Sequence, residues 1–471
     1  MSTSALEHLL EAVDYSLSVH NGGQVGIEDA DRLRDTVRHL VAASAFGETD
    51  SLQGWARYLV RAAAIKLGIV PASIHALYLA RGREDIPHTF TVPAINLRAL
   101  SFDAARAVFR VAQRMGAGAF IFEIARSEIG YTDQRPVEYA TSILGAAIAE
   151  GYRGPVFIQG DHFQISAKRY ASDPQGEVQA VRDLILEAIQ AGFFNIDVDT
   201  STLVNLSQKT IPQQQALNAH LSAELTAFIR QHEPQGVTVS VGGEIGEVGG
   251  HNSTEAELRA YMDGYRAALG DAIGLSKISV QTGTSHGGVV LPDGSIARVK
   301  VDFDTLHRLS VVARREYGMG GAVQHGASTL PEEAFGKFVE SQAIEVHLAT
   351  NFQNIMYERL EDDLRQDMYA YLDEHHAHER KPDMTDEQFY YKTRKRAIGP
   401  FKQSLWNMNP ERRAEIALAW EAQFERLFTL LGVGDTRRYV EAHVHAQPVP
   451  PDLHHYLGQS LLAEEAGDLA D

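Results

Sequence analysis

Short apolar runs alternate with amphipathic segments through the middle of the chain. Eight runs rich in β-branched and aromatic residues are separated by segments of about a dozen residues with apolar positions at helical spacing. This alternation predicts a closed (β/α)8 barrel, the TIM barrel. An open doubly wound sheet is the alternative, but no GxGxxG fingerprint follows the first run. The predicted strands are Phe90–Leu97, Gly118–Ile124, Pro155–Gly160, Phe193–Val198, Val237–Val241, Lys277–Thr282, Gly320–Gln324 and Ala343–Leu348.

The two ends of the chain follow a different pattern. Apolar residues recur at helical spacing before the first strand, as in Leu9–Val13–Leu17, and the chain is helical again after the last strand. We therefore expect a helical N-terminal extension over residues 1–85, a catalytic barrel over 86–360, and a helical C-terminal extension with an acidic tail over 361–471. Such extensions are expected to make subunit contacts, which favours a homo-oligomer.

Composition narrows the chemistry of the barrel. The 471 residues include no cysteine, which excludes disulfides, thiolate nucleophiles and Cys-based zinc sites. A transition metal would therefore need histidine and carboxylate ligands, and the chain has 20 histidines. The formal net charge of −19 disfavours nucleic acid and membrane lipid as partners. Because the chain has neither a signal-peptide pattern nor a long apolar run, we expect a cytoplasmic protein.

Polar residues gather where the predicted strands end, which is where barrel enzymes build their active sites. Asp161 and His162 end the third strand, Glu244 ends the fifth, and His286 and His325 end the sixth and seventh. A single histidine at a strand end is more often a packing residue than a ligand. Three imidazoles and a carboxylate converging from four strands favour a site for zinc or a similar divalent ion.

Small residues follow two of these histidines. Gly287 and Gly326 would let backbone N–H groups approach a phosphate, although both are also ordinary turn residues. Ser328 offers a hydroxyl to the same anion, or caps the helix that follows it.

In six short sequence strings at and near these strand ends, the sequence resembles the class II, metal-dependent fructose-bisphosphate/tagatose-bisphosphate aldolases. The resemblance covers about residues 88–360 in the order of the family, with a weaker echo near 390–402. Each string is a weak signal, but six in order are specific. The strings are Val92–Asn96, Gly160–His162, Gly192–Ser201, Glu244–Gly246 with Gly249–Gly250, Ser285–Gly287 and His325–Ser328.

The resemblance implies an enzyme that reversibly cleaves a ketose phosphate to dihydroxyacetone phosphate and an aldehyde. His162, His286 and His325 resemble the metal ligands of the family, and Glu244 resembles a carboxylate that the metal also visits. Asp161 resembles the proton-transfer residue. A divalent metal, expected to be Zn²⁺, stabilises the enediolate left by such a cleavage. The family also implies a monovalent cation near the phosphate.

The resemblance assigns further residues to the sugar phosphate substrate. The basic run Lys392–Arg396 is interpreted as a solvated helix face, or as the source of an arginine that reaches a neighbouring subunit's site, with Arg394 the best match and Arg396 the alternative. On the eighth strand His347 and Asn351 replace residues that hold the ketone half in the family. The candidate substrate residues are Asn96, Asp199, Gly287, Gly326, Ser328, His347, Thr350, Asn351 and Arg394.

Two departures from the family leave the substrate open. His251–Asn252 follow Gly249–Gly250, where the family carries two acidic residues on a loop, and the eighth strand is altered. Aldol chemistry is therefore predicted more firmly than fructose 1,6-bisphosphate itself, and a sulfonated, shortened or stereoisomeric sugar phosphate is an alternative. Two further alternatives are a non-catalytic barrel subunit that supports a tagatose-bisphosphate aldolase and a metal-dependent hydrolase on the same fold.

Overall fold

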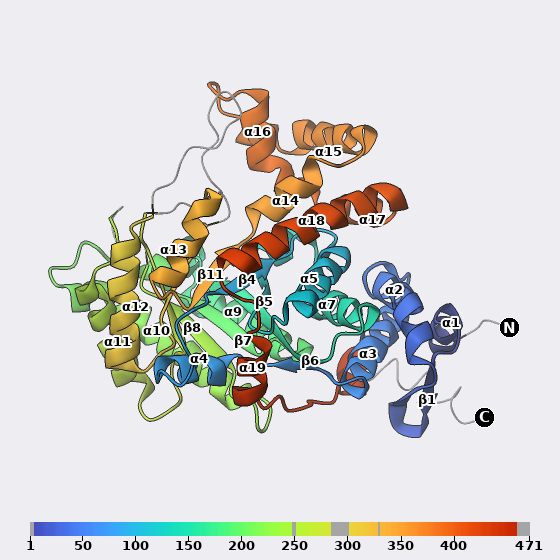
Figure 1. Cartoon of the computed structure of the whole chain (residues 1–471). Coiled ribbons are helices and arrows are strands. Elements are labelled where there is room, and N and C mark those ends of the chain that lie inside the picture. Colours follow the sequence, from blue (N-terminus) through green and yellow to red (C-terminus); the bar gives the residue numbers. More distant parts are fainter. Residues whose placement is uncertain (1–3, 247–250, 284–300, 328–329, 459–471) are drawn as a thin grey trace.

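Eight parallel strands form a closed barrel at the centre of the molecule (Figure 1). This computed structural model describes residues 4–246, 251–283, 301–327 and 330–458. Neighbouring strands follow the order β6-β5-β4-β11-β10-β9-β8-β7, and a β6–β7 pairing closes the ring, which confirms the predicted TIM barrel. The strands are β4 (Val92–Asn96), β5 (Ile121–Ala125), β6 (Gly154–Gln164), β7 (Asn195–Asp199), β8 (Ser240–Glu244), β9 (Lys277–Val280), β10 (Ala322–Gln324) and β11 (Glu345–Leu348).

A helix follows each barrel strand and covers the outside of the sheet. These helices present an apolar face to the sheet. Helices α5 and α9 end at a glycine in the left-handed conformation, Gly116 (φ 62°) and Gly192 (φ 96°). None of the helices among the described residues is both long and apolar enough to cross a membrane. The covering helices are α5 (Ser101–Met115), α7 (Pro136–Ala149), α9 (Pro174–Ala191), α10 (Ile211–His232), α11 (Glu255–Leu269), α12 (Phe303–Tyr317), α13 (Phe335–Glu340) and α14 (Thr350–Tyr357).

The N-terminal segment is not helical throughout, which corrects the expectation for residues 1–85. Helix α1 (Ala5–Ala12) ends before two residues with positive φ, Asp14 and Tyr15. Leu17 therefore lies in strand β1 (Leu17–His20), which pairs with β2 (Gln24–Ile27) across a turn containing two glycines with positive φ. After α2 (Ala30–Phe46) and α3 (Asp50–Lys66), strand β3 (Ile69–Ala72) pairs with the start of β6, and α4 (His75–Gly82) leads to the barrel.

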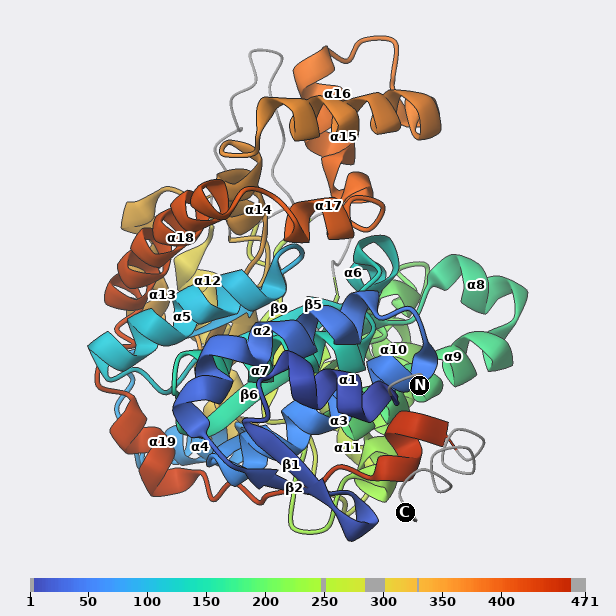
Figure 2. The same cartoon turned by 90° about the vertical axis from the view of Figure 1, so that its right-hand side faces the viewer.

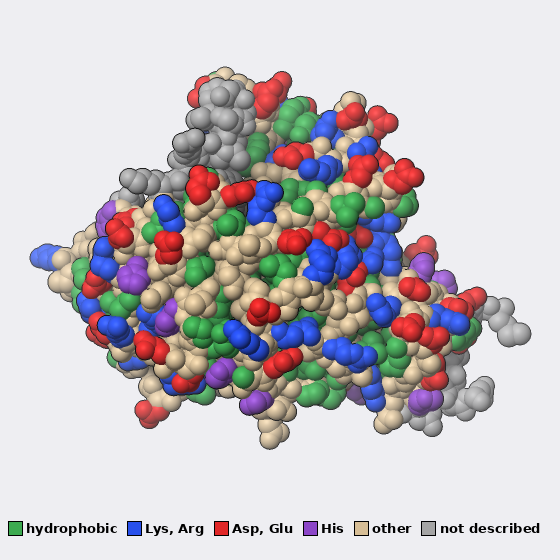
Figure 3. Space-filling model, in the orientation of Figure 1, with side chains coloured by type: hydrophobic (Ala, Val, Ile, Leu, Met, Phe, Trp, Pro, Cys, Tyr) green, Lys and Arg blue, Asp and Glu red, His purple; other side chains and the backbone are tan. Residues whose placement is uncertain are grey.

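The C-terminal segment lies against one side and one end of the barrel (Figures 1 and 2). Helix α18 (Pro410–Leu430) runs along α5, where Arg110 and Arg114 both pair with Glu421 at 2.6 and 3.0 Å. Acidic and basic side chains are intermixed on this face of the molecule (Figure 3). The other elements described in this segment are α15 (Asp362–His375), the short helix η4 (Ala377–Glu379), α16 (Asp386–Thr393), the short helix η5 (Arg394–Ala397), α17 (Lys402–Trp406) and α19 (Arg437–His443).

Candidate active site

A cavity of about 490 Å³ opens at the carboxyl ends of the barrel strands. Its floor is formed by the ends of strands β4, β5, β6, β10 and β11. One wall is formed by two inserted helices, α6 (Arg126–Thr132) and α8 (Ala167–Ser172), together with Ser166, which precedes α8. Asp161, His162 and His325 lie on this floor. The cavity therefore has the position at which barrel enzymes hold their substrates.

A local irregularity in β6 places two consecutive side chains at the cavity. The β6–β7 pairing shifts by one residue between Gly160 and Phe163, as in a β-bulge. Within this bulge His162 has a φ of 42°, in the left-handed region that a histidine seldom occupies. In a regular strand adjacent side chains point to opposite faces, so the bulge is what lets Asp161 and His162 both line the cavity.

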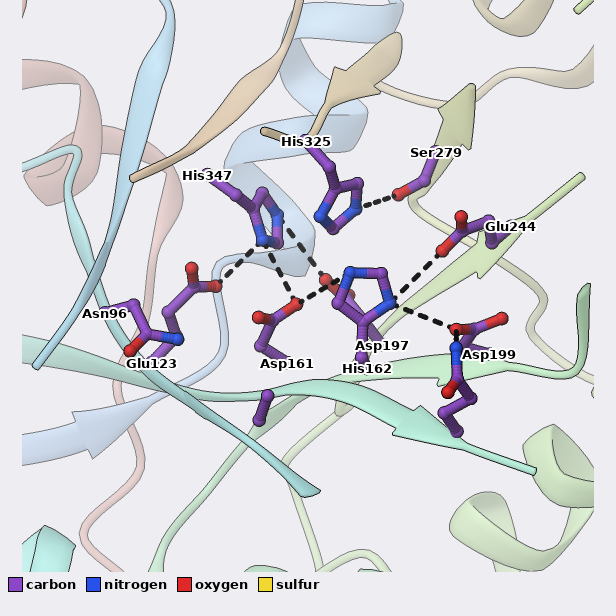
Figure 4. A network of polar contacts seen from close by, with 12 residues as sticks. Asn96, Glu123, Asp161, His162, Asp197, Asp199, Glu244, Ser279, His325 and His347 are labelled. Carbon is purple, nitrogen blue, oxygen red and sulfur yellow. Dashed lines mark hydrogen bonds and ion pairs between the residues drawn. The ribbon is translucent and has the colours of Figure 1, made fainter. Parts of the chain in front are cut away.

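His162, Glu244 and His325 form a group that fits a divalent metal (Figure 4). One ligand atom from each lies within 4.8 Å of the others, and His162 Nδ1 is 3.3 Å from Glu244 and 3.1 Å from Asp199. Ser279 Oγ lies 2.9 Å from His325 Nε2, which orients that ring. Two imidazoles and a carboxylate in a cavity are a suitable donor set for zinc or manganese. The fourth predicted ligand, His286, lies outside the described residues.

Electrostatics at the floor are dominated by carboxylates. Burial disfavours a charged His162, but the negative charges of Asp161 and Glu244 outweigh it and raise the pKa of His162 well above its usual value. Burial would also raise the pKa of Asp161, yet the imidazoles of His162 and His347 hold that pKa well below its usual range. Asp161 is therefore a carboxylate at neutral pH. The group attracts positive charge, and a bound cation would displace the imidazole protons.

Below the cavity floor the barrel interior is polar. Lys277 Nζ contacts Glu345 at 2.5 Å, Gln159 at 2.7 Å and Asp197 at 2.9 Å. Gly242 makes room for this contact, since a Cβ there would lie 2.3 Å from Asp197 Oδ1. Most TIM barrels fill this space with branched apolar side chains. Here a network of buried charges connects the bottom of the barrel to its mouth.

His347 joins this network to the predicted site. Its Nε2 is 2.6 Å from Glu345, and its Nδ1 is 3.1 Å from Glu123 and 3.2 Å from Asp161 (Figure 4). Its ring centroid lies 4.0 Å from that of His325. Burial and the charge of Asp161 raise the pKa of Glu123 to about 8.

The structure brings some of the predicted substrate residues to the cavity and not others. Asn96, Gly326, His347 and Thr350 line it, with Asn96 Nδ2 donating a 2.5 Å hydrogen bond to Glu128. Asp199 is buried beside His162, where it accepts hydrogen bonds from Gln164 and Ser201, and neither Asp199 nor Asn351 is among the lining residues. Gly287 and Ser328 lie outside the described residues.

The basic run contributes Lys395, and not Arg394, to the cavity of its own chain. Arg394 is buried against the rings of Tyr357 and Tyr391, and its guanidinium donates to Asn354, so it does not line the cavity. The prediction that Arg394 reaches the site of a neighbouring subunit concerns a second copy of the chain and stays a prediction. Lys395, the next residue, lines the cavity instead. Arg396 pairs with Glu379 at 3.4 Å and also lies away from the lining.

Sequence reasoning missed Glu123, Lys277 and Glu345. Each lies in a strand whose other residues are mostly apolar, as in Ile121–Ala125. An acidic or basic residue inside a buried strand is a signal, because a buried charge needs a partner. That signal identifies the residues but not their partners, which come from different strands.

Comparisons with known proteins agree with this architecture. The sequence profile of the family described as fructose-bisphosphate aldolase class-II matches residues 86–402, which is more than half of the chain. No curated protein sequence matches the chain significantly.

Among solved structures, the fructuronate-tagaturonate epimerase of Cohnella laeviribosi is 12% identical, with a TM-score of 0.53 over 90% of both chains. A probable tagatose 6 phosphate kinase from Sinorhizobium meliloti is 16% identical, with a TM-score of 0.51 over 80% of this chain and 100% of its own. The fructose-bisphosphate aldolase of Campylobacter jejuni is 15% identical, with a TM-score of 0.47 over 78% and 96%. At these identities the first two likenesses, with TM-scores above 0.5, show a shared fold.

Proposed function

This chain belongs to the class II fructose-bisphosphate aldolase family, and from that premise we propose that it is a metal-dependent aldolase. It cleaves a ketose phosphate or bisphosphate reversibly to dihydroxyacetone phosphate and an aldehyde. The observation that carries the proposal is the convergence of His162, Glu244 and His325 beside the buried carboxylate of Asp161. These residues, with His286 from the sequence, would hold a divalent metal, Zn²⁺ by the family resemblance.

The cleavage step needs one base and one stabiliser of negative charge, and release of dihydroxyacetone phosphate then needs one proton from solvent on the enediolate carbon. Asp161 takes the proton of the hydroxyl at the cleaved bond, that oxygen becomes the aldehyde carbonyl, and the electron pair of the carbon–carbon bond passes to the ketone half as an enediolate. The metal, when bound, supplies the positive charge that stabilises this enediolate. Asn96 and Thr350 offer hydrogen-bonding groups to the substrate at the cavity wall.

Lys395 is the residue that we assign to the anionic end of the substrate. Its side chain makes no hydrogen bond or ion pair with the described residues, and its Nζ lies 5.7 Å from the centre of the Tyr131 ring at the cavity. Burial and the charges of Arg98 and Arg396 lower the pKa of Lys395 more than Glu128 and Glu379 raise it, so carboxylates balance this cation only in part. A phosphate or carboxylate on the substrate would provide that balance.

Lys395→Ala is therefore expected to raise KM about tenfold to a hundredfold while kcat changes little, because a hydrogen bond to a charged group contributes about 1.5–3 kcal/mol. The matched control is Lys392→Ala, which removes an exposed lysine of the same run that faces Glu379 at 3.8 Å. Steady-state kinetics of both variants check the assignment. Equal KM values for the two variants would remove Lys395 from the substrate site.

A second candidate function is epimerisation, in which the same cleavage is followed by addition of the enediolate to the other face of the aldehyde. Among the described residues, the acids Glu255 and Glu257 follow His251. Glu257 Oε2 accepts from the backbone nitrogen of Thr254 at 2.7 Å and Glu255 pairs with Arg259 at 3.3 Å, so neither of these two is placed to protonate the enediolate. An enediolate that is not protonated stays available for re-addition. The fold shared with the epimerase over 90% of both chains agrees with this option.

One experiment tests both candidates. Metal-loaded enzyme is incubated with fructose and tagatose bisphosphates and with hexuluronates, release of dihydroxyacetone phosphate is coupled to a dehydrogenase, and epimers are detected by ¹³C NMR. We expect cleavage or epimerisation that is lost with chelator and in His325→Ala. Metal-loaded enzyme that converts none of these substrates would contradict the proposal and favour a supporting, non-catalytic subunit.

A further inference from the structure

Three buried polar atoms at the floor of the cavity have no hydrogen-bond partner among the described residues. They are Oε1 of Glu123, Oδ1 of Asp161 and Nδ1 of His347. All three residues are nearly inaccessible, at 0, 6 and 5% exposed. Buried polar atoms are rarely left unsatisfied, and several in one place indicate a missing partner.

Two of these atoms, His347 Nδ1 and Asp161 Oδ1, lie close together, and the Glu123 carboxylate faces His347 through its other oxygen, Oε2. His347 Nδ1 lies 3.1 Å from the Glu123 carboxylate and 3.2 Å from Asp161 Oδ1, but neither contact has hydrogen-bond geometry. Asp161, His325 and His347 each bring a ligand atom within 4.8 Å of the others. This group shares His325 with the group of His162 and Glu244, and His347 also belongs to a third group with Glu123 and Glu345.

The other ring nitrogen of His347, Nε2, already has a hydrogen-bond partner. Its Nε2 contacts the Glu345 carboxylate at 2.6 Å, and Glu345 also contacts Lys277 and Tyr78. A histidine that donates one ring N–H to a carboxylate turns the lone pair of its other nitrogen toward a metal. Here that lone pair would belong to Nδ1, which faces the two carboxylates.

Four carboxylates are buried around this point: Glu123, Asp161, Asp197 and Glu345. Lys277 touches Asp197 and Glu345 and not Glu123 or Asp161. Glu123 and Asp161 face imidazoles and no lysine or arginine among the described residues: His347 lies 3.1 Å from Glu123 and 3.2 Å from Asp161, and a bound cation would replace the imidazole protons there. Burying unbalanced carboxylates is costly unless a proton or a metal compensates them.

We propose that the cavity floor holds a second divalent metal ion next to the ion of the proposed aldolase site, bound by His347 Nδ1, Glu123 and Oδ1 of Asp161, which leaves the other oxygen of Asp161 to act as the base. One nitrogen and two carboxylate ligands suit Mn²⁺ or Zn²⁺. Two neighbouring cations can stabilise both oxygens of an enediolate. The location rests on the proposed function, because the second ion is defined by its position beside the first.

Metal stoichiometry tests this proposal without any activity assay. Purified protein is stripped with a chelator, loaded with Mn²⁺ or Zn²⁺ and passed through a desalting column, and bound metal is counted by mass spectrometry and by titration calorimetry. We expect two ions per chain in the wild type and one in His347→Gln and in Glu123→Gln. The control His232→Gln, a substitution of an exposed histidine on α10, should retain two.

The outcomes separate the two proposals. One ion in the wild type would overturn the second site and leave the aldolase site standing, whereas no bound ion would overturn both. Two ions in both floor variants would show that the second ion binds elsewhere, which also overturns this inference. Glu123→Gln keeps the shape of the side chain, so it reports on the site even if His347→Gln folds poorly.

Discussion

Asp161→Asn is expected to lower kcat by about a hundredfold to ten-thousandfold, which is the usual contribution of a positioned general base. The amide has the shape of the carboxylate but cannot accept the proton of the substrate hydroxyl. The imidazoles of His162 and His347 hold the pKa of Asp161 far below neutrality, so the wild-type group is unprotonated and ready to act as a base. KM should change less than kcat, because the loss falls on the chemical step.

Steady-state kinetics and a metal count on the same sample check this expectation. The metal at His162, Glu244 and His325 should be retained, since that group holds its ligand atoms within 4.8 Å without Asp161, whereas the proposed second ion should bind more weakly because one of its ligands is removed. Asp383→Asn, at an exposed position of the C-terminal segment, serves as the control and should leave both values unchanged. A kcat within about threefold of the wild type would exclude Asp161 as the base, because that is far below the usual effect.

Much of the fold was predictable because barrel strands and helices have distinct periods. Each predicted strand overlaps an observed one, and Asp161, His162, Glu244 and His325 follow from reading the ends of those strands. The hairpin after α1 was not predictable from periodicity. Leu17 continues the helical spacing of Leu9, and only the left-handed backbone at Asp14 and Tyr15 ends the helix before it.

The composition of the floor could not be predicted from any single strand. His347, Glu123 and Lys277 meet in space from β11, β5 and β9, and a sequence gives the residues of a strand but not the side chains they face across the barrel. The different environments of Arg394 and Lys395 likewise could not be predicted from the sequence. They are adjacent in a basic run, yet the short helix η5 packs one between tyrosines and directs the other to the cavity.

Lys277→Met is expected to destabilise the protein by about 3–5 kcal/mol, the usual cost of leaving a buried ion pair without one partner. The ammonium group is 1% exposed and balances Glu345 and Asp197. Burial would lower the pKa of Lys277, but those two carboxylates outweigh it and raise the pKa. Because the folded-state pKa is above the unfolded value, this stabilisation is fully present at pH 7 and is lost only as the pH rises through the folded-state pKa.

Urea unfolding at pH 7 in the presence of chelator measures this loss without a contribution from bound metal. Lys66→Met, which removes an exposed lysine at the end of α3, should change the free energy of unfolding by less than about 0.5 kcal/mol. The double variant Lys277→Met/Glu345→Gln should recover part of the stability, because it removes a charge together with its partner. If the double variant were no more stable than Lys277→Met, the loss would come from packing, and the role of Lys277 in balancing the buried carboxylates would be wrong.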